Sequence, residues 1–189
     1  SMNSIHPVLT KNAAFVQAKN LKVGDEIMLK DFSYEFGEID EPDRASYMGY
    51  LVSEGNLVTH RNRYHSVQFT NTDRQVIDDF KVLATSACGE EPKESMRWKD
   101  HERWKDAWLL SYHKGEICSQ TIEWGFVAGS HNKSVPQFVM QGNRNTVSAF
   151  LATLFEGDGT MAEDSHSRRA MSVQYDTVSA ELAEQVHLL

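Results

Sequence analysis

Two acidic residues occupy equivalent places in two copies of one short element. Glu54 lies near the end of segment 47–55 and Asp158 near the end of segment 151–159, and each is followed by glycine. In the second copy, apolar residues recur at helical spacing from Val147 to Phe155, which predicts a helix buried along one side. Carboxylates are ligands that Mg²⁺ accepts. The pair therefore suits metal-assisted chemistry if the fold brings the two copies together.

Each predicted helix also carries a row of small residues, one at every fourth position. Such a row lets a second helix approach closely, backbone to backbone. The rows are Ala45, Gly49 and Ser53 in the first copy, and Ala149, Thr153 and Gly157 in the second. An acid and a glycine also end many ordinary helices. Two unrelated core helices are therefore the alternative to a true repeat.

The repeat continues beyond these helices. Segments 56–60 and 65–70 read as strands, and the stretch 172–175 copies 66–69 at an offset of 106. A capping box at Thr72 and Gln75 predicts the start of a further helix. The buried stripe of that helix is Val76, Ile77, Phe80 and Leu83, and its counterparts are Leu182, Ala183, Val186 and Leu189. Nothing after them copies 84–140. We therefore expect a truncated second repeat, whose last apolar face is mobile or covered by self-association.

Basic residues alternate with other residues between positions 97 and 105, which predicts extended chain with one basic face. The segment 108–113 would complete a hairpin, and 121–126 reads as a short helix. A solvated face is the alternative reading. As a contact surface for DNA we predict the basic residues together with turn residues and two strand glutamines. They are Arg61, Arg63, Gln68, Arg97, Lys99, Arg103, Lys105, Arg168, Arg169 and Gln174.

The composition of the chain narrows the classes of protein to which it could belong. The formal net charge of -8 argues against DNA binding, but six acids lie between Asp31 and Asp43, where no Lys or Arg occurs. The rest of the chain is therefore nearly neutral and has room for a basic face. Cys88 and Cys118 form no paired motif, and the histidines lack the spacing of metal ligands. No run is long and apolar enough for a membrane span. We expect a cytoplasmic, intracellular protein without a membrane partner.

The paired segments 47–55 and 151–159 resemble the signature helices of LAGLIDADG homing endonucleases. This resemblance implies an α+β fold of two pseudo-twofold-related repeats, with antiparallel sheets in the major groove of double-stranded DNA. Glu54 and Asp158 would lie next to the DNA as catalytic and metal-binding residues, with Mg²⁺ as cofactor. The segment 133–138 resembles a Lys-x-(Ile/Val)-Pro-x-Phe segment whose lysine reaches the active site, so Lys133 takes that role. Otherwise Lys133 is an exposed loop lysine.

Residues 3–30 read as short strands with a tight turn at Gly24–Asp25. They resemble the β-rich Hint splicing domain of inteins, in which His6 would match the histidine that assists the first acyl shift. A turn histidine before proline is the alternative. The chain lacks the upstream Cys or Ser nucleophile and the final His-Asn pair, and splicing needs both acyl acceptors. We expect a fragment that cannot splice alone and whose full-length parent is flanked by host exteins.

The predicted organisation is a partial Hint segment at 1–30, an acidic linker at 31–42, a first LAGLIDADG repeat at 43–140 and a truncated second repeat at 141–189. The predicted function is site-specific, metal-dependent cleavage of both DNA strands by an endonuclease embedded in an intein. The alternative is a LAGLIDADG element that binds DNA or RNA without cutting, either a degenerate intein or a maturase. A pure binding module would have no use for the two acids.

Overall fold

The computed structural model describes residues 7–11, 15–28, 35–60, 63–97, 105–163 and 171–189. The chain forms two compact units, Ser1–Tyr34 and Glu35–Leu189. Within the described residues, no helix combines the length and the apolar character that crossing a bilayer requires.

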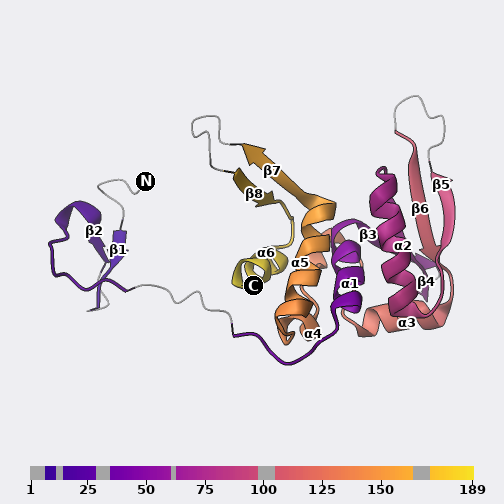
Figure 1. Cartoon of the computed structure of the whole chain (residues 1–189), viewed down its shortest axis with the longest axis horizontal. Helices are drawn as coiled ribbons and strands as arrows, with labels where there is room; N and C mark the ends of the chain where they lie inside the picture. Colours follow the sequence, from indigo (N-terminus) through magenta and orange to yellow (C-terminus); the bar gives the residue numbers. More distant parts are fainter. Residues whose placement is uncertain (1–6, 12–14, 29–34, 61–62, 98–104, 164–170) are drawn as a thin grey trace. The chain divides into compact units, whose positions relative to one another are not determined.

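The first unit contains a small antiparallel pair of strands, β1 (Pro7–Leu9) and β2 (Phe15–Gln17), followed by the 3-10 turn η1 (Ala18–Asn20) (Figure 1). The predicted turn at Gly24–Asp25 is confirmed. Gly24 has a φ of 102°, which favours glycine, and the Asp25 N–H donates to the Lys22 carbonyl at 3.0 Å. His6 lies outside the described residues.

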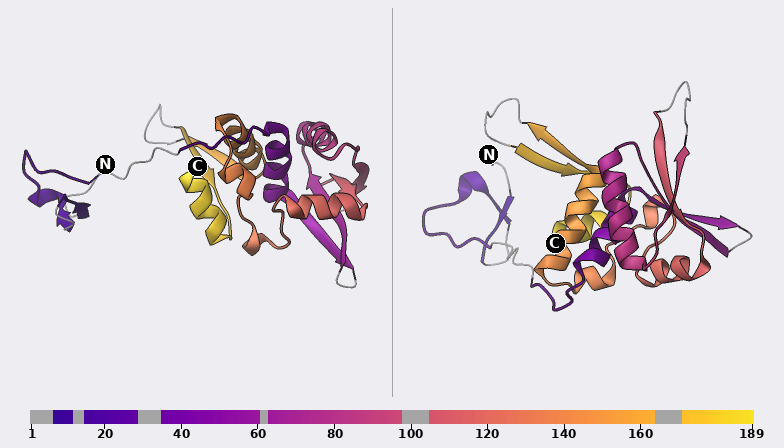
Figure 2. Two further views of the ribbon diagram at one scale, coloured as in Figure 1. Left: turned by 90° about the horizontal axis from the view of Figure 1, so that it is seen from below. Right: turned by 45° about the vertical axis from the view of Figure 1, so that its right-hand side comes forward.

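The second unit combines helices with antiparallel sheets. In chain order its elements are α1 (Pro42–Glu54), β3 (Gly55–His60), β4 (Arg63–Asn71), α2 (Arg74–Cys88), β5 (Lys93–Arg97), β6 (Ala107–Tyr112), α3 (Gly115–Glu123), η2 (Ser130–Asn132), α4 (Gln137–Met140), α5 (Arg144–Asp158), β7 (Gly159–Glu163), β8 (Met171–Tyr175) and α6 (Ala180–Leu188). Among the described residues the strands form one sheet in the order β3-β4-β6-β5 and a second pair β7-β8. Figure 2 shows α1 and α5 side by side, with β7-β8 beside α5 and the larger sheet beyond α1.

The two copies of the repeat share their strand register over the first four residue pairs, after which the first copy has a bulge between Val58 and Thr59. In the first copy Gly55 pairs with Phe69 and Asn56 with Gln68, and the equivalent pairs in the second copy begin with Gly159 and Tyr175. The offset is 104 residues on the first strand and 106 on the second, so the two extra residues fall in the hairpin loop. The predicted repeat is therefore confirmed for these four residue pairs.

The row of small residues brings α1 and α5 into direct contact. A Cβ placed on Gly49 would lie 2.1 Å from Thr153 Oγ1, and one placed on Gly157 would lie 2.1 Å from Ser53 Oγ. Since neither distance leaves room for a carbon atom, the close approach depends on both glycines. The Thr153 hydroxyl also donates to the Ser46 carbonyl across the interface at 2.9 Å.

Aromatic side chains fill the space between the paired helices and the larger sheet. Phe69 on β4 stacks on Phe80 of α2, with ring centroids 4.1 Å apart. Tyr47 and Tyr50 on α1 each lie against Phe80 as well. The predicted stripe of α2 is therefore largely right, and Ala84 also lies fully buried on that face.

Two local expectations need correction. Helix α2 is capped by Asp73 rather than by Thr72, because the Asp73 carboxylate accepts the Gln75 N–H at 2.8 Å. The helix expected at 121–126 is α3, which begins at Gly115 and ends at Glu123.

The apolar face of the last helix is not left uncovered as expected. Leu182 is fully buried, and Val186 and Leu189 pack partly against the core. The Gln185 side chain accepts the Val135 N–H at 2.6 Å, so residues before α4 cover this face. The burial of α6 removes the reason for self-association through that helix.

The exposed apolar surface of the second repeat lies instead on its strands. Met161 and Val173 form a cross-strand pair and are 65% and 60% exposed. Their counterparts, Leu57 and Val67, are 5% and 1% exposed. In the first repeat α3 packs against β4 and contributes to the same core.

The part of the acidic segment that the structure describes is tied to the start of α5. Ile39 forms a parallel bridge to Gly142, and its carbonyl accepts the Asn143 N–H at 2.8 Å. The Thr146 hydroxyl donates to the same carbonyl and accepts the Glu41 N–H, each at 2.8 Å. The residues just before α1 are thus hydrogen-bonded to the start of α5.

Candidate active site and DNA-contact face

The two predicted acids lie where each signature helix passes directly into a strand. Glu54 is the last residue of α1 and Asp158 the last of α5. The glycine after each acid is extended, and its N–H closes the helix on Leu51 or Phe155. A Cβ placed on Gly157 would lie 3.7 Å from Glu54 Cγ, so the side chain of one acid lies beside the helix that carries the other.

Lys133 reaches the same place from the segment before α4. Its ammonium group donates to the Ser53 carbonyl at 2.7 Å, and Ser53 directly precedes Glu54. The backbone of Lys133 is held in turn by the start of α6, since the Ser179 hydroxyl donates to the Lys133 carbonyl at 2.6 Å. The reading of Lys133 as an exposed loop lysine is therefore wrong.

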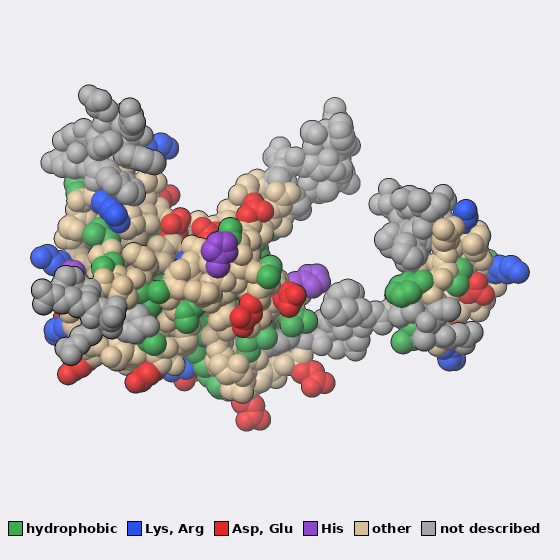
Figure 3. All heavy atoms as spheres, turned by 180° about the vertical axis from the view of Figure 1, so that it is seen from behind, with side chains coloured by type: hydrophobic (Ala, Val, Ile, Leu, Met, Phe, Trp, Pro, Cys, Tyr) green, Lys and Arg blue, Asp and Glu red, His purple; other side chains and the backbone are tan. Residues whose placement is uncertain are grey.

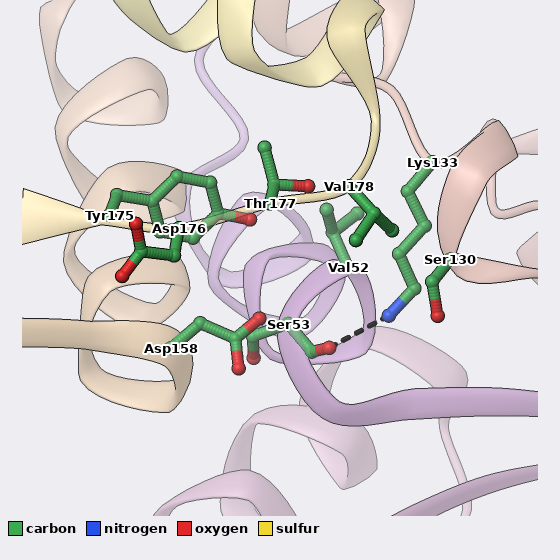
Figure 4. A pocket seen from close by; sticks show the side chains of 9 residues that line it. All are labelled: Val52, Ser53, Ser130, Lys133, Asp158, Tyr175, Asp176, Thr177 and Val178. Carbon is green, nitrogen blue, oxygen red and sulfur yellow. Dashed lines mark hydrogen bonds between the residues drawn. The ribbon is translucent and has the colours of Figure 1, made fainter.

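Lys133 and Asp158 both line an open hollow of about 330 Å³ at the end of the helix pair. In Figure 4 the two side chains reach Ser53 from opposite sides, and the strand end with Tyr175 and Asp176 closes the hollow above Asp158. Asp176 was not identified from the sequence. The first repeat has threonine at the equivalent position, so the repeat pattern gave no signal for it.

The charges of the three predicted catalytic groups act on one another. Burial raises the pKa of Glu54, and the Asp158 carboxylate raises it further, whereas Lys133 acts to lower it. Burial also raises the pKa of Asp158 against the effect of Lys133. Burial lowers the pKa of Lys133, and both acids oppose that shift. Residues that are distant in sequence therefore form one electrostatic cluster.

This cluster fits a hydrated divalent cation. Mg²⁺ usually takes one or two carboxylates, keeps several waters and accepts phosphate oxygens. Glu54 and Asp158 supply two carboxylates that repel each other and remain open to solvent, and a cation between them would relieve that repulsion. Among the described residues, no group of three or more His, Cys, Asp or Glu side chains is arranged as a closed metal site.

The larger sheet presents a polar row on the face that points away from α2. Phe69 faces α2, so its neighbour Gln68 lies on the opposite face. The register aligns Gln68 with Asn56 on one side and with Ser111 and then Lys93 on the other. Asn56 and Lys93, which are both exposed, were missed, whereas Ser111 is buried and its hydroxyl donates to the Lys93 carbonyl. Lys93 in particular becomes a neighbour only through strand pairing that its local sequence does not show.

The other predicted DNA contacts have different outcomes. Arg97 ends β5 on the face of Lys93 and is exposed, and Lys105 is exposed just before β6. Gln174 is exposed on β8. Arg63 belongs to β4, but its side chain is not among those described. Arg61, Lys99, Arg103, Arg168 and Arg169 lie outside the described residues. On the face of the second unit seen in Figure 3, Lys and Arg side chains lie mainly toward the larger sheet, whereas acidic side chains are spread over the middle and the lower margin.

Comparison with known proteins agrees with this site. Residues 145–189, from α5 to the end of the chain, match the family described as "LAGLIDADG-like domain". The matched residues include Asp158, Gln174 and nearly all of α5.

Several curated proteins with different names match most of the chain. The similarity to the ribonucleoside-diphosphate reductase NrdEB subunit alpha of Bacillus subtilis is 21% identity over 92% of this chain and 16% of the relative. Protein RecA of Mycobacterium tuberculosis is 26% identical over 97% of this chain and 23% of the relative. A DNA polymerase of Thermococcus kodakarensis is 31% identical over 80% of this chain and 8% of the relative. The chain thus spans less than a quarter of these relatives.

Two solved structures resemble this chain at TM-scores below 0.5. One is the homing endonuclease I-WcaI bound to its DNA recognition sequence, with a TM-score of 0.46 and 12% identity over 79% of this chain and 65% of the other. The second is I-DmoI in complex with its target DNA nicked in the coding strand, in the presence of 2 mM Mn, with a TM-score of 0.43 and 12% identity over 63% of each chain. Because both TM-scores are below 0.5, the candidate site rests on the geometry of this chain and not on these two structures.

Proposed function

We propose that this chain is the nuclease part of a homing endonuclease embedded in an intein, and that it cuts both strands of double-stranded DNA at a specific site. The observation that carries the proposal is the convergence of Glu54, Asp158 and Lys133 at the base of the packed helix pair. That base lies between two hairpins that share the register of their first four residue pairs.

The residues have distinct roles in the proposed reaction. Glu54 and Asp158 would hold Mg²⁺, which supplies an activated water and stabilises the leaving oxygen. Because each acid belongs to one repeat, each would serve principally one DNA strand. Lys133 would stabilise the negative charge that develops on the phosphate. The close packing of α1 and α5 fixes the spacing between the two acids.

The intein context is supported by the relatives rather than by the site. Three differently named proteins match 80% to 97% of this chain, but the match covers only 8% to 23% of each of them. A segment shared by otherwise different proteins is typical of an inserted element. In this context the flanking host sequences are exteins, and the setting is intracellular. The splicing role of His6 is part of the same proposal.

The test uses the full-length parent with Mg²⁺ and a plasmid that carries the joined sequences flanking the insertion. We expect linear product from the parent. Glu54→Gln and Asp158→Asn should each retain binding in a gel-shift assay and lose cleavage. Glu116→Gln, which neutralises an exposed acid at the start of α3, should cut normally. Cleavage by both site variants would refute the mechanism, and binding without cleavage by the parent would favour the non-catalytic alternative.

A further inference from the structure

We propose that Gln68 and Gln174 each recognise an adenine, so that the preferred DNA carries adenine at two positions related by the pseudo-twofold symmetry, one on each strand. This inference rests on the proposed DNA-binding function and adds a feature of the target sequence to it.

The two glutamines occupy the same place relative to the two acids. In each repeat the first cross-strand pair joins the glycine after the acid to an aromatic residue, and the next pair contains the glutamine. Those second pairs are Asn56 with Gln68, and Thr160 with Gln174. Each step along a strand is about 3.4 Å. Both glutamines therefore lie near the centre of the site, at equal distances along the strand from their own acids.

Both glutamines also lie on the side of their strands that points away from the helices. Phe69 stacks on α2, and Tyr175 packs on Phe155 of α5 with ring centroids 5.5 Å apart. Side chains alternate along a strand, so Gln68 and Gln174 project to the opposite side. Gln174 is exposed and Gln68 is half-buried. This is the face that the symmetric hairpins would lay against the major groove.

The chemistry of the amide favours adenine. Glutamine pairs with adenine through two hydrogen bonds in the major groove, donating to N7 and accepting from N6. The Gln68 amide nitrogen donates to Ser66 Oγ at 3.2 Å, which orients the group. Among the described residues, the Gln68 side chain makes no other hydrogen bond, so its second N–H and its carbonyl oxygen can serve as the donor and acceptor that adenine requires. Serine occupies the equivalent position, 172, in the second repeat.

The cross-strand neighbours of the two glutamines differ, so the predicted symmetry of the DNA target is confined to the two adenines. Asn56 pairs with Gln68, whereas Thr160 pairs with Gln174. Asparagine favours adenine, whereas threonine bonds to any base or contacts the thymine methyl group. The target should therefore be symmetric at the two adenines and differ between its halves at the bases next to them.

The experiment is selection of bound sequences from a random duplex library by the full chain, in EDTA to prevent cleavage. We expect adenine on opposite strands at two mirror positions. Gln68→Ala should relax the preference at one position and Gln174→Ala at the other. Replacing either adenine by guanine should weaken binding by wild type roughly 5- to 150-fold. The matched control is Gln75→Ala, since Gln75 is an exposed glutamine on α2 that bonds to Asp79. It should leave both preferences intact.

The possible results separate the two proposals. Absence of DNA binding would refute the proposed function and this inference together. Selection of a specific site without the adenine pair would refute this inference and leave the proposed function standing. A preference that neither glutamine variant relaxes at its own position would do the same.

Discussion

Replacing Gly49 by alanine tests whether the contact between α1 and α5 sets the site. The added Cβ would lie 2.1 Å from Thr153 Oγ1 and 2.5 Å from the Phe150 carbonyl. Non-bonded heavy atoms settle at about 3.5 Å, so the helices must separate by on the order of 1 Å. Overpacking of this kind costs about 1–3 kcal/mol, whereas the higher helix propensity of alanine returns about 1 kcal/mol. Because one contact is to backbone, we expect the upper end of that cost and a net loss of about 2 kcal/mol.

The assay is urea unfolding, with Gly115→Ala as the matched control. Gly115 starts α3, and a Cβ there would meet nothing within 4 Å. Its replacement should change the free energy of unfolding by less than about 0.5 kcal/mol. Separation of the helices also separates the acids, and a displacement of about 1 Å can cost 100-fold in rate. Equal stability and cleavage in Gly49→Ala and the control would refute the idea that this contact positions the acids.

Three further predictions concern burial, titration and DNA contacts. Val67→Thr should cost about 1–3 kcal/mol, because it buries a hydroxyl, whereas Val173→Thr should change stability by less than about 0.5 kcal/mol. Equal losses in urea unfolding would show that the β7-β8 surface is covered in solution. Because the pKa of Glu54 is raised in the folded protein, its ionised form lowers the free energy of unfolding at pH values above the folded pKa. Below the unfolded pKa of about 4.3, Glu54 is protonated in both states and this effect disappears. Glu54→Gln should therefore be more stable than wild type at pH 7 but not at pH 3.5, and a gain that persists at pH 3.5 would contradict this cause. Arg97→Ala and Lys105→Ala should each reduce the slope of log affinity against log salt by about 0.9, and an unchanged slope would mean that these residues are merely solvated.

The repeat could be predicted because its signals are local. Helical spacing, the small residues at every fourth position and the acid followed by glycine all lie within one element. The copied stretch 172–175 even predicted the two-residue difference between the hairpins, which the strand register confirms. The cap of α2 was misassigned because Thr72 and Asp73 are neighbours and both residue types cap helices. Only the bond from the Gln75 N–H to Asp73 distinguishes them.

The missed parts of the site depend on pairing between distant segments. Lys93 joins the row of Gln68 only because β6 lies between β4 and β5, an order that their sequences do not encode locally. The apolar surface of the second repeat was expected on α6, because the comparison with α2 assumed the same surroundings. The segment of Lys133 and Val135 contacts α6 and its cap instead, through hydrogen bonds to Gln185 and Ser179. The surface without a cover is the pair Met161 and Val173, whose counterparts lie in the core to which α3 contributes.

The contact between α1 and α5 nearest the two acids explains why helix packing and the candidate catalytic residues could be predicted from the same sequence pattern. Ser53 and Gly157 meet across the interface, and the next residue in each helix is a predicted catalytic acid. The carbonyl of Ser53 also accepts a hydrogen bond from the Lys133 ammonium group. The residues that allow the backbones to meet therefore bring the acids and the lysine to one place. A larger residue at position 157 would meet both the Ser53 hydroxyl and the Glu54 side chain, so it would disturb the helix contact and the site at once.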